Sequence, residues 1–223
     1  MGINSKHMQK ISLGVESLNK PWENLKMCEL GAQRIVKKTV SKVDEWYGFT
    51  YSKEFFESKE VEHISLDINN KWGSLYIDLS VIQDKWHGYF DILTDYGTSE
   101  HVKNGQYEVF ANAHNFIREG GVMCHCTPVV GRIQMGHPVR ESVYYHEDFY
   151  EKLAKLNSYE IIDMEIMRDD RARKKQGGDL TCVLRKTQDN VFCTKKDFWE
   201  LNAIDDYSKN MSLTKERFNF IEK

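Results

Sequence analysis

Short apolar runs alternate with longer segments of helical periodicity along most of the chain. Runs rich in β-branched, Leu and aromatic residues, each bounded by polar or turn residues, predict strands at 25–30, 61–67, 74–79, 89–94, 122–126, 159–167 and 180–186. Apolar residues at three- and four-residue spacings predict helices over 32–46, 104–118 and 146–156. Strands that alternate with helices favour an α/β fold, with a doubly wound, mostly parallel sheet.

The remaining segments predict additions to this sheet. We expect an N-terminal helical segment over 1–24, a main domain over 25–187 and a C-terminal helical extension over 188–223. The extension carries two predicted helices, at 195–206 and 212–221. Residues 129–145 predict a long loop, and loops of that length often serve as lids. The chain of 223 residues is long enough for one such domain with a substantial core.

Composition and charge exclude several classes of protein. With 40% hydrophobic and 29% charged residues, the chain is typical of a globular protein, and it contains no continuous apolar run of membrane-spanning length. The 31 basic and 34 acidic residues give a net charge of −3, which provides no overall basic field for nucleic acid. Five cysteines, an odd number, indicate a reducing setting. We therefore expect a cytoplasmic protein without a membrane span or a nucleic-acid partner; its oligomeric state stays open.

Acidic residues follow the first four predicted strands. They are Glu29, Asp67, Asp78 and Asp95. Because ligands of a doubly wound sheet bind beyond the carboxyl ends of its strands, we expect these residues to border one site. Carboxylates accept hydrogen bonds from hydroxyls and amines and stabilise cations. The site therefore suits a ligand with ribose hydroxyls, an exocyclic amine and a positive charge.

At these positions the sequence resembles the class I S-adenosylmethionine-dependent methyltransferases, over roughly residues 22 to 187. The segment 28–33 (Cys-Glu-Leu-Gly-Ala-Gln) is similar to the acidic, glycine-rich motif that ends the family's first strand, and 90–97 resembles the fourth-strand motif. Gly120 and Gly121, which we expect to end the helix over 104–118, resemble the turn into the fifth strand. The resemblance implies a seven-stranded sheet with an antiparallel last strand, and S-adenosylmethionine as the cofactor of a methyltransferase.

The resemblance also implies roles for single residues. Asp67 corresponds to the residue that holds the ribose hydroxyls, and Asp78 to the residue that contacts the exocyclic amine of adenine. The cofactor-binding residues that it implies are Glu29, Gly31, Ala32, Asp67, Ile68, Asp78, Leu79, Asp95, Tyr96 and Gly97.

Methyl transfer from a sulfonium requires an aligned acceptor and, for a hydroxyl or amine, removal of its proton. Histidine suits that task, so we predict His101 and Asp95 as catalytic residues. The predicted contacts of a small-molecule or sugar-like acceptor, whose identity the sequence leaves open, are Glu100, His101, His125 and Tyr145. No metal site is predicted, since His125 points away from its neighbours Cys124 and Cys126 on a regular strand.

Alternative interpretations stay open for residues and for function. Asp67 and Asp78 can cap helices, the latter a helix that begins near Val81, and Asp95 can form a turn. The first motif holds Gly31 as its only glycine, which keeps open a non-catalytic binding or partner module of the same fold. A dinucleotide-dependent oxidoreductase would need a Gly-x-Gly-x-x-Gly turn, which residues 31–36 do not provide.

Overall fold

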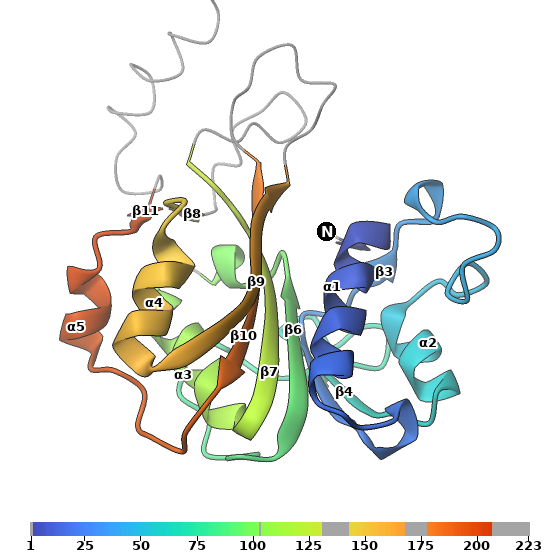
Figure 1. Ribbon diagram of the computed structural model, residues 1–223, viewed down its shortest axis with the longest axis horizontal. Coiled ribbons are helices and arrows are strands. Elements are labelled where there is room, and N and C mark those ends of the chain that lie inside the picture. The colour runs from blue at the N-terminus through green and yellow to red at the C-terminus, as the bar shows by residue number, and fades with distance from the viewer. Residues whose placement is uncertain (1, 103, 131–142, 168–177, 207–223) are drawn as a thin grey trace, which may run out of the picture.

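The structure, a computed structural model, describes residues 2–102, 104–130, 143–167 and 178–206. Its centre is a seven-stranded sheet in the order β5-β4-β2-β6-β7-β10-β9 (Figure 1). The strands of this sheet are β2 (Lys26–Leu30), β4 (Glu62–Asp67), β5 (Leu75–Tyr76), β6 (Phe90–Tyr96), β7 (Ile117–Pro128), β9 (Tyr159–Met167) and β10 (Asp179–Lys186).

The direction of the strands confirms the predicted sheet. Strands β5, β4, β2, β6 and β7 pair in parallel, while β10 is antiparallel to both β7 and β9. The carboxyl ends of the five parallel strands therefore lie at one edge of the sheet. The doubly wound α/β class, with a mostly parallel sheet and an antiparallel last strand, is confirmed.

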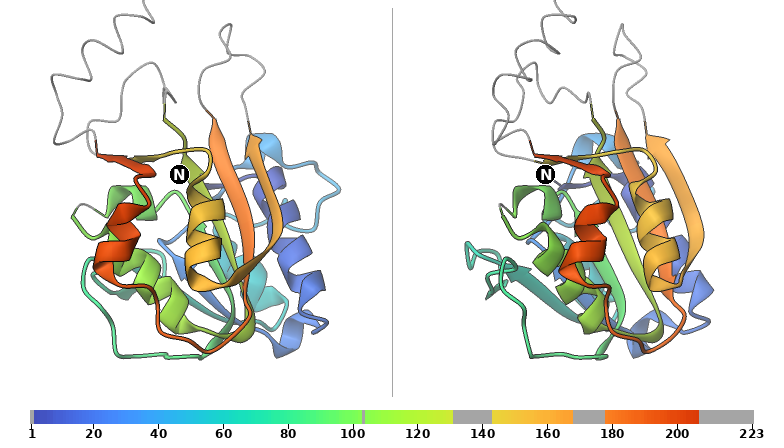
Figure 2. Two further views of the ribbon diagram at one scale, coloured as in Figure 1. Left: turned by 60° about the vertical axis from the view of Figure 1, so that its left-hand side comes forward. Right: turned by 90° about the vertical axis from the view of Figure 1, so that its left-hand side faces the viewer.

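Helices cover both faces of the sheet. Helices α1 (Ser5–Ser17) and α2 (Ser52–Ser58) pack on one face, and α3 (Gln106–Phe116), α4 (Phe149–Asn157) and α5 (Lys195–Glu200) pack on the other. Figure 2 shows α4 and α5 on the opposite side of the sheet from α1. Strand side chains alternate between the two cores: Ile92 and Val122 pack with α1, and Leu93 and Met123 pack with α3.

The predicted helix over 32–46 is wrong. This stretch forms the short strand β3 (Arg34–Ile35), the 3-10 turn η2 (Lys37–Thr39) and further turns. Strand β3 pairs in parallel with β1 (Gly2–Ile3), and Val43, one of the apolar positions that suggested the helix, is 89% exposed. The stretch is rich in β-branched residues, which favour extended backbone over helix, and α1 and α2 cover this face instead.

Helix α3 ends at Phe116, before the glycine pair that was expected to stop it. The buried Lys186 ammonium donates hydrogen bonds to the carbonyls of His114 and Ile117, 3.2 Å from each, and so satisfies acceptors at the helix end. Gly120 and Gly121 lie inside β7, where the register with β6 shifts. Gly120 has a φ of +74°, so the pair forms an irregularity in the strand instead of a helix terminus.

Two further predicted helices differ from the structure. No helix begins near Val81, because residues 81–88 form bends and turns. The predicted helix over 195–206 shortens to α5, and the chain then forms β11 (Ile204–Asp206), antiparallel to β8 (Val143–Tyr145). The predicted helix over 212–221 and most of the predicted loop over 129–145 lie outside the described residues. No helix in the described segments is long and apolar enough to cross a membrane.

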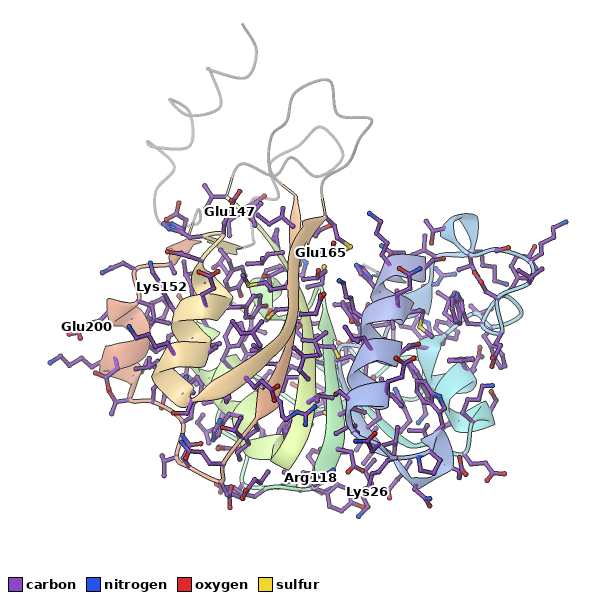
Figure 3. All side chains as sticks on the ribbon, viewed as in Figure 1. Lys26, Arg118, Glu147, Lys152, Glu165 and Glu200 are labelled. Carbon is purple, nitrogen blue, oxygen red and sulfur yellow. The ribbon has the colours of Figure 1, made fainter. Side chains whose placement is uncertain are left out.

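A charged network ties together the amino ends of the strands. The buried Asp91 carboxylate accepts hydrogen bonds from Lys20 Nζ at 2.8 Å, Arg118 Nε at 2.7 Å and the Lys26 backbone N–H at 3.0 Å. Figure 3 places Lys26 and Arg118 at the edge of the sheet opposite to Glu165. These charges are paired with one another and stabilise the fold. The candidate site lies at the opposite, carboxyl edge of the sheet.

Candidate functional site

A cavity of about 360 Å³ lies beyond the carboxyl ends of β4, β5 and β6. Its volume falls in the range of about 300–1,000 Å³ that is typical of small-molecule sites. Its lining residues are Leu66, Asp67, Ile68, Ile77, Asp78, Leu79, Ser80, Gly97, Thr98, His101 and Val102. The structure therefore brings six of the predicted site residues to one cavity: Asp67, Ile68, Asp78, Leu79, Gly97 and His101.

Asp67 is the last residue of β4 and is half-buried at the cavity. Its Oδ2 accepts a hydrogen bond from the Ala32 N–H at 3.0 Å, and its Oδ1 accepts one from the Asn69 N–H at 3.0 Å. Each carboxylate oxygen has two lone pairs, so each can still accept one more hydrogen bond. Asp67 thus joins the ends of β2 and β4 and keeps acceptor capacity at the cavity.

Asp78 follows β5, the edge strand of the sheet. Its Oδ1 accepts hydrogen bonds from the Ser80 hydroxyl at 2.7 Å and the Ser80 N–H at 2.9 Å. These two bonds lower the pKa of the Asp78 carboxyl below its usual value, the hydroxyl bond contributing most. Oδ2 accepts no hydrogen bond from any residue that the structure describes. The Asp78 carboxylate is therefore ionised and held in place through Oδ1, and its Oδ2 remains able to accept a hydrogen bond.

Glu29 lies on β2 below the cavity and does not line it. Its buried carboxylate accepts hydrogen bonds from Ser52 Oγ at 2.5 Å, Ser65 Oγ at 2.9 Å and the Gln33 N–H at 3.2 Å. Burial raises the pKa of Glu29 to about 7, although these three hydrogen bonds oppose the shift. In this structure Glu29 uses its oxygens to hold the turn after β2.

Gly31 begins the turn after β2 with a φ of +74°, a conformation that glycine adopts readily. A Cβ at this position would overlap Thr98 Oγ1 and would lie 3.1 Å from Gln33 Nε2. Thr98 Oγ1 donates a hydrogen bond to the Leu30 carbonyl at 2.7 Å. Gly31 and Ala32, both predicted to bind cofactor, are thus absent from the cavity lining, and the side chains of Thr98 and Gln33 cover Gly31.

Asp95 and Tyr96, at the end of β6, are buried and absent from the cavity lining. Asp95 Oδ1 accepts a hydrogen bond from the Ser99 N–H at 3.1 Å, and its Oδ2 lies 3.1 Å from His125 Nδ1. The Tyr96 ring stacks on the His7 ring of α1 with centroids 4.5 Å apart. Of the predicted fourth-strand motif, Gly97 is the residue that reaches the cavity.

His101 lies in the 3-10 turn η3 (Ser99–His101), at the cavity, with 44% of its side chain exposed. Its Nε2 is 3.9 Å from Oε1 of Glu100, whose side chain is almost fully buried. His101 therefore combines access to solvent with a place at the cavity.

His125 and Tyr145, two predicted substrate contacts, belong to a buried polar group beside Asp95. The His125 ring stacks on Tyr150 with centroids 5.4 Å apart. The Tyr145 hydroxyl donates to Gln106 Oε1 at 2.5 Å, and burial raises the pKa of Tyr145 well above its usual value. Both side chains are at most 2% exposed, so the structure places them in the core and outside the cavity lining.

Two residues that shape the site, Ser80 and Thr98, were not among the predicted site residues. Thr98 and Ser80 line the cavity, and Gln33 covers Gly31. The Asp-x-Ser spacing of Asp78 and Ser80 is a local signal for side-chain hydrogen bonding and could have identified Ser80. Within the described part of the chain, no group of three or more His, Cys, Asp or Glu side chains is placed to hold a metal ion.

Comparisons with known proteins place this geometry in a known fold. No family model and no curated protein matches the sequence. A solved structure of the 1,6-didemethyltoxoflavin-N1-methyltransferase of Burkholderia thailandensis, with bound 1,6-didemethyltoxoflavin and S-adenosylhomocysteine, is similar with a TM-score of 0.54 at 15% identity; the match covers 83% of this chain and 80% of that one.

Two further solved structures are similar. The geranyl diphosphate C-methyltransferase of Streptomyces coelicolor A3(2), in complex with Mg²⁺, geranyl diphosphate and S-adenosyl-L-homocysteine, has a TM-score of 0.55 at 7% identity, covering 80% of this chain and 77% of that one. A SAM-dependent methyltransferase of Methanosarcina mazei has a TM-score of 0.50 at 8% identity, covering 83% and 99%. The chain therefore has the class I methyltransferase fold, as the sequence resemblance predicted.

Proposed function

We propose that the cavity binds the adenosine part of S-adenosylmethionine, and that the protein is a methyltransferase for a small-molecule or sugar-like acceptor. The observation that carries this proposal is the convergence of Asp67 and Asp78 on one cavity from adjacent strands of a class I methyltransferase fold. Two carboxylates at neighbouring strand ends offer acceptors for both the ribose hydroxyls and the exocyclic amine of adenine.

The residues of the cavity fit an adenosine. Asp78 Oδ2 is available to accept a hydrogen bond from the exocyclic amine of adenine, and both Asp67 oxygens can accept one more bond, from ribose hydroxyls. The apolar side chains of Leu79 and Val102 line the same cavity and suit the faces of a planar base. The methionine part of the cofactor fits less well than the adenosine part, because the side chains of Thr98 and Gln33 cover the neighbouring Gly31.

The acceptor side of the proposal rests on His101. S-adenosylmethionine supplies a methyl group on a positively charged sulfur, and a hydroxyl or amine acceptor must lose a proton. His101 is exposed at the cavity and can take that proton, and the Glu100 carboxyl lies 3.9 Å from its Nε2. The names of the similar proteins from Burkholderia thailandensis and Streptomyces coelicolor specify small-molecule substrates, which supports an acceptor of that size.

A second candidate function is a non-catalytic, nucleoside-binding member of this fold. The specific observation that favours it is the cover that Thr98 and Gln33 form over Gly31, where the family motif has further glycines. The two candidates share the adenosine site and differ in turnover. Methyl transfer, measured across a panel of hydroxyl and amine acceptors, separates them.

Calorimetric titration with S-adenosylhomocysteine tests the shared site. We expect binding to the wild type, and a loss of about 10- to 100-fold in affinity for Asp78→Ala, the equivalent of about 1–3 kcal/mol for a hydrogen bond to a charged group. Asp84→Ala is the matched control, because Asp84 is an exposed acid of the next turn and does not line the cavity. Equal losses in both variants would refute the adenosine site, and no binding of S-adenosylhomocysteine to the wild type at millimolar ligand would refute the methyltransferase proposal.

Replacement of His101 tests the acceptor side once an acceptor is found in the panel. His101→Ala should lower kcat by about 10²- to 10⁴-fold, the usual contribution of a general base, and leave the affinity for S-adenosylhomocysteine nearly unchanged. His87→Ala serves as the control, since His87 is exposed and outside the cavity. An unchanged kcat in His101→Ala contradicts the role of this histidine.

A further inference from the structure

The sheet order determines where a substituent on the ribose must run. Asp78 follows β5 and Asp67 ends β4, and the next strands in the sheet are β2 and β6. With the base near Asp78 and the ribose near Asp67, a group on the ribose 5′ carbon points toward the ends of β2 and β6. Those ends are Leu30, Gly31 and the loop that holds Gly97 and Thr98.

Side chains of this protein close that path. The Thr98 hydroxyl donates to the Leu30 carbonyl at 2.7 Å and so bridges the ends of β6 and β2. It lies so close to Gly31 that even one additional carbon on Gly31 would overlap it. The Gln33 amide packs on the same glycine, with its Nε2 3.4 Å from both the Leu30 carbonyl and Thr98 Oγ1. The amino-acid tail of S-adenosylmethionine therefore meets a filled space.

The Gln33 side chain is held more weakly than its backbone. The Gln33 N–H donates to Glu29, and its carbonyl accepts from Ser52 Oγ at 3.1 Å. In contrast, both hydrogen bonds of Nε2 are at the limit of length, and the buried Oε1 accepts none from the residues described. A buried carboxamide oxygen without a hydrogen-bond donor is destabilising, so this side chain contributes bulk more than hydrogen bonding.

We propose that Gln33 and Thr98 close the amino-acid end of the cavity, so that the site binds adenine nucleosides without an amino-acid tail more tightly than S-adenosylmethionine or S-adenosylhomocysteine. The inference rests on the proposed adenosine site and adds a ligand preference to it. Tail-bearing ligands enter only when the Gln33 side chain moves aside, and the cost of that movement lowers their affinity.

The test compares two ligands that differ in the tail. We expect the wild type to bind 5′-methylthioadenosine about tenfold or more tightly than S-adenosylhomocysteine in calorimetric titrations. Gln33→Ala opens the path and should reduce this preference to about threefold or less by tightening S-adenosylhomocysteine. Gln33→Met is the matched control, because it keeps the length of the side chain and should keep the preference. Thr98→Ala opens the same path from β6 and replaces Gln33→Ala if that variant does not fold.

Equal affinities of the wild type for the two ligands, or weaker S-adenosylhomocysteine binding in Gln33→Ala, would overturn the closure and leave the adenosine site intact; the latter would make Gln33 a contact of the tail. Failure of both ligands to bind the wild type would instead overturn the proposed adenosine site itself. Thermal unfolding of each variant confirms that it is folded before titration.

Discussion

At the scale of residues, the strand-end carboxylates divide into two kinds. Asp67 and Asp78 lie at the cavity with acceptor capacity left over, whereas Glu29 is enclosed by Ser52, Ser65 and the turn after β2. The positions could be predicted from the sequence, since each follows an apolar run. The orientation of the Glu29 side chain could not be predicted, because it depends on serines that lie 23 and 36 residues away along the chain.

The buried Glu29 makes stability depend on pH. Its pKa is about 7 in the folded protein and about 4.5 in the unfolded chain, so the folded state binds more protons between these values. Stability therefore falls as pH rises through this window, by up to roughly 3 kcal/mol. Glu29→Gln does not titrate, so the free energy of unfolding of the wild type should decline relative to that of this variant between about pH 4.5 and about pH 7.

Urea denaturation of both proteins across this window measures the difference. Because every other titrating group is shared, subtraction isolates the contribution of Glu29. A difference in the free energy of unfolding that does not change with pH would contradict the buried, proton-binding carboxyl.

At the scale of elements, contacts between residues far apart in the sequence determine structure that the local hydrophobic pattern did not predict. The predicted helix over 32–46 rested on apolar spacing, but hydrogen bonds from Ala32 to Asp67 and from Gln33 to Glu29 hold the start of this stretch in a turn. Strand β3 then pairs with β1, which is far away in the sequence. The strands were predicted more closely, because continuous burial leaves an uninterrupted apolar run that can be seen locally.

The glycine pair in β7 allows this strand to approach β6 closely. A Cβ at Gly121 would lie 2.8 Å from Ile117 Cγ2 and 2.9 Å from the Asp91 carbonyl, so the strand can approach β6 only without a side chain there. Gly121→Ala should lower the free energy of unfolding by about 1–3 kcal/mol in denaturant titrations. Gly48→Ala is the control, because a Cβ at Gly48 meets nothing within 4 Å. Equal stability of the two variants would contradict the close approach.

The end of α3 offers a second test at the scale of elements. Lys186→Met removes the donor to the carbonyls of His114 and Ile117 and should destabilise the protein by about 1–3 kcal/mol. Lys195→Met removes an exposed ion pair with Glu108 and should cost less than about 1 kcal/mol. Thermal or urea unfolding of the two variants compares them directly, and an unaffected Lys186→Met protein would refute the assigned role of Lys186.

At the scale of the whole molecule, the two edges of the sheet have different tasks. The amino edge neutralises Asp91 with Lys20 and Arg118, while the carboxyl edge holds the cavity with Asp67 and Asp78. The alternation of strands and helices was sufficient to predict this sheet and the edge at which the cavity lies. The cover over Gly31 could not be predicted, because Thr98 and Gln33 meet only when β2 and β6 become neighbours.

A crystal structure of the protein soaked with 5′-methylthioadenosine would show directly whether the cavity binds an adenine nucleoside. We expect the adenine amine within hydrogen-bonding distance of Asp78 Oδ2, the ribose hydroxyls at Asp67, and the methylthio group against Thr98. A nucleoside bound elsewhere on the protein, or bound in the cavity with its ribose away from Asp67, would contradict the adenosine site at the strand ends.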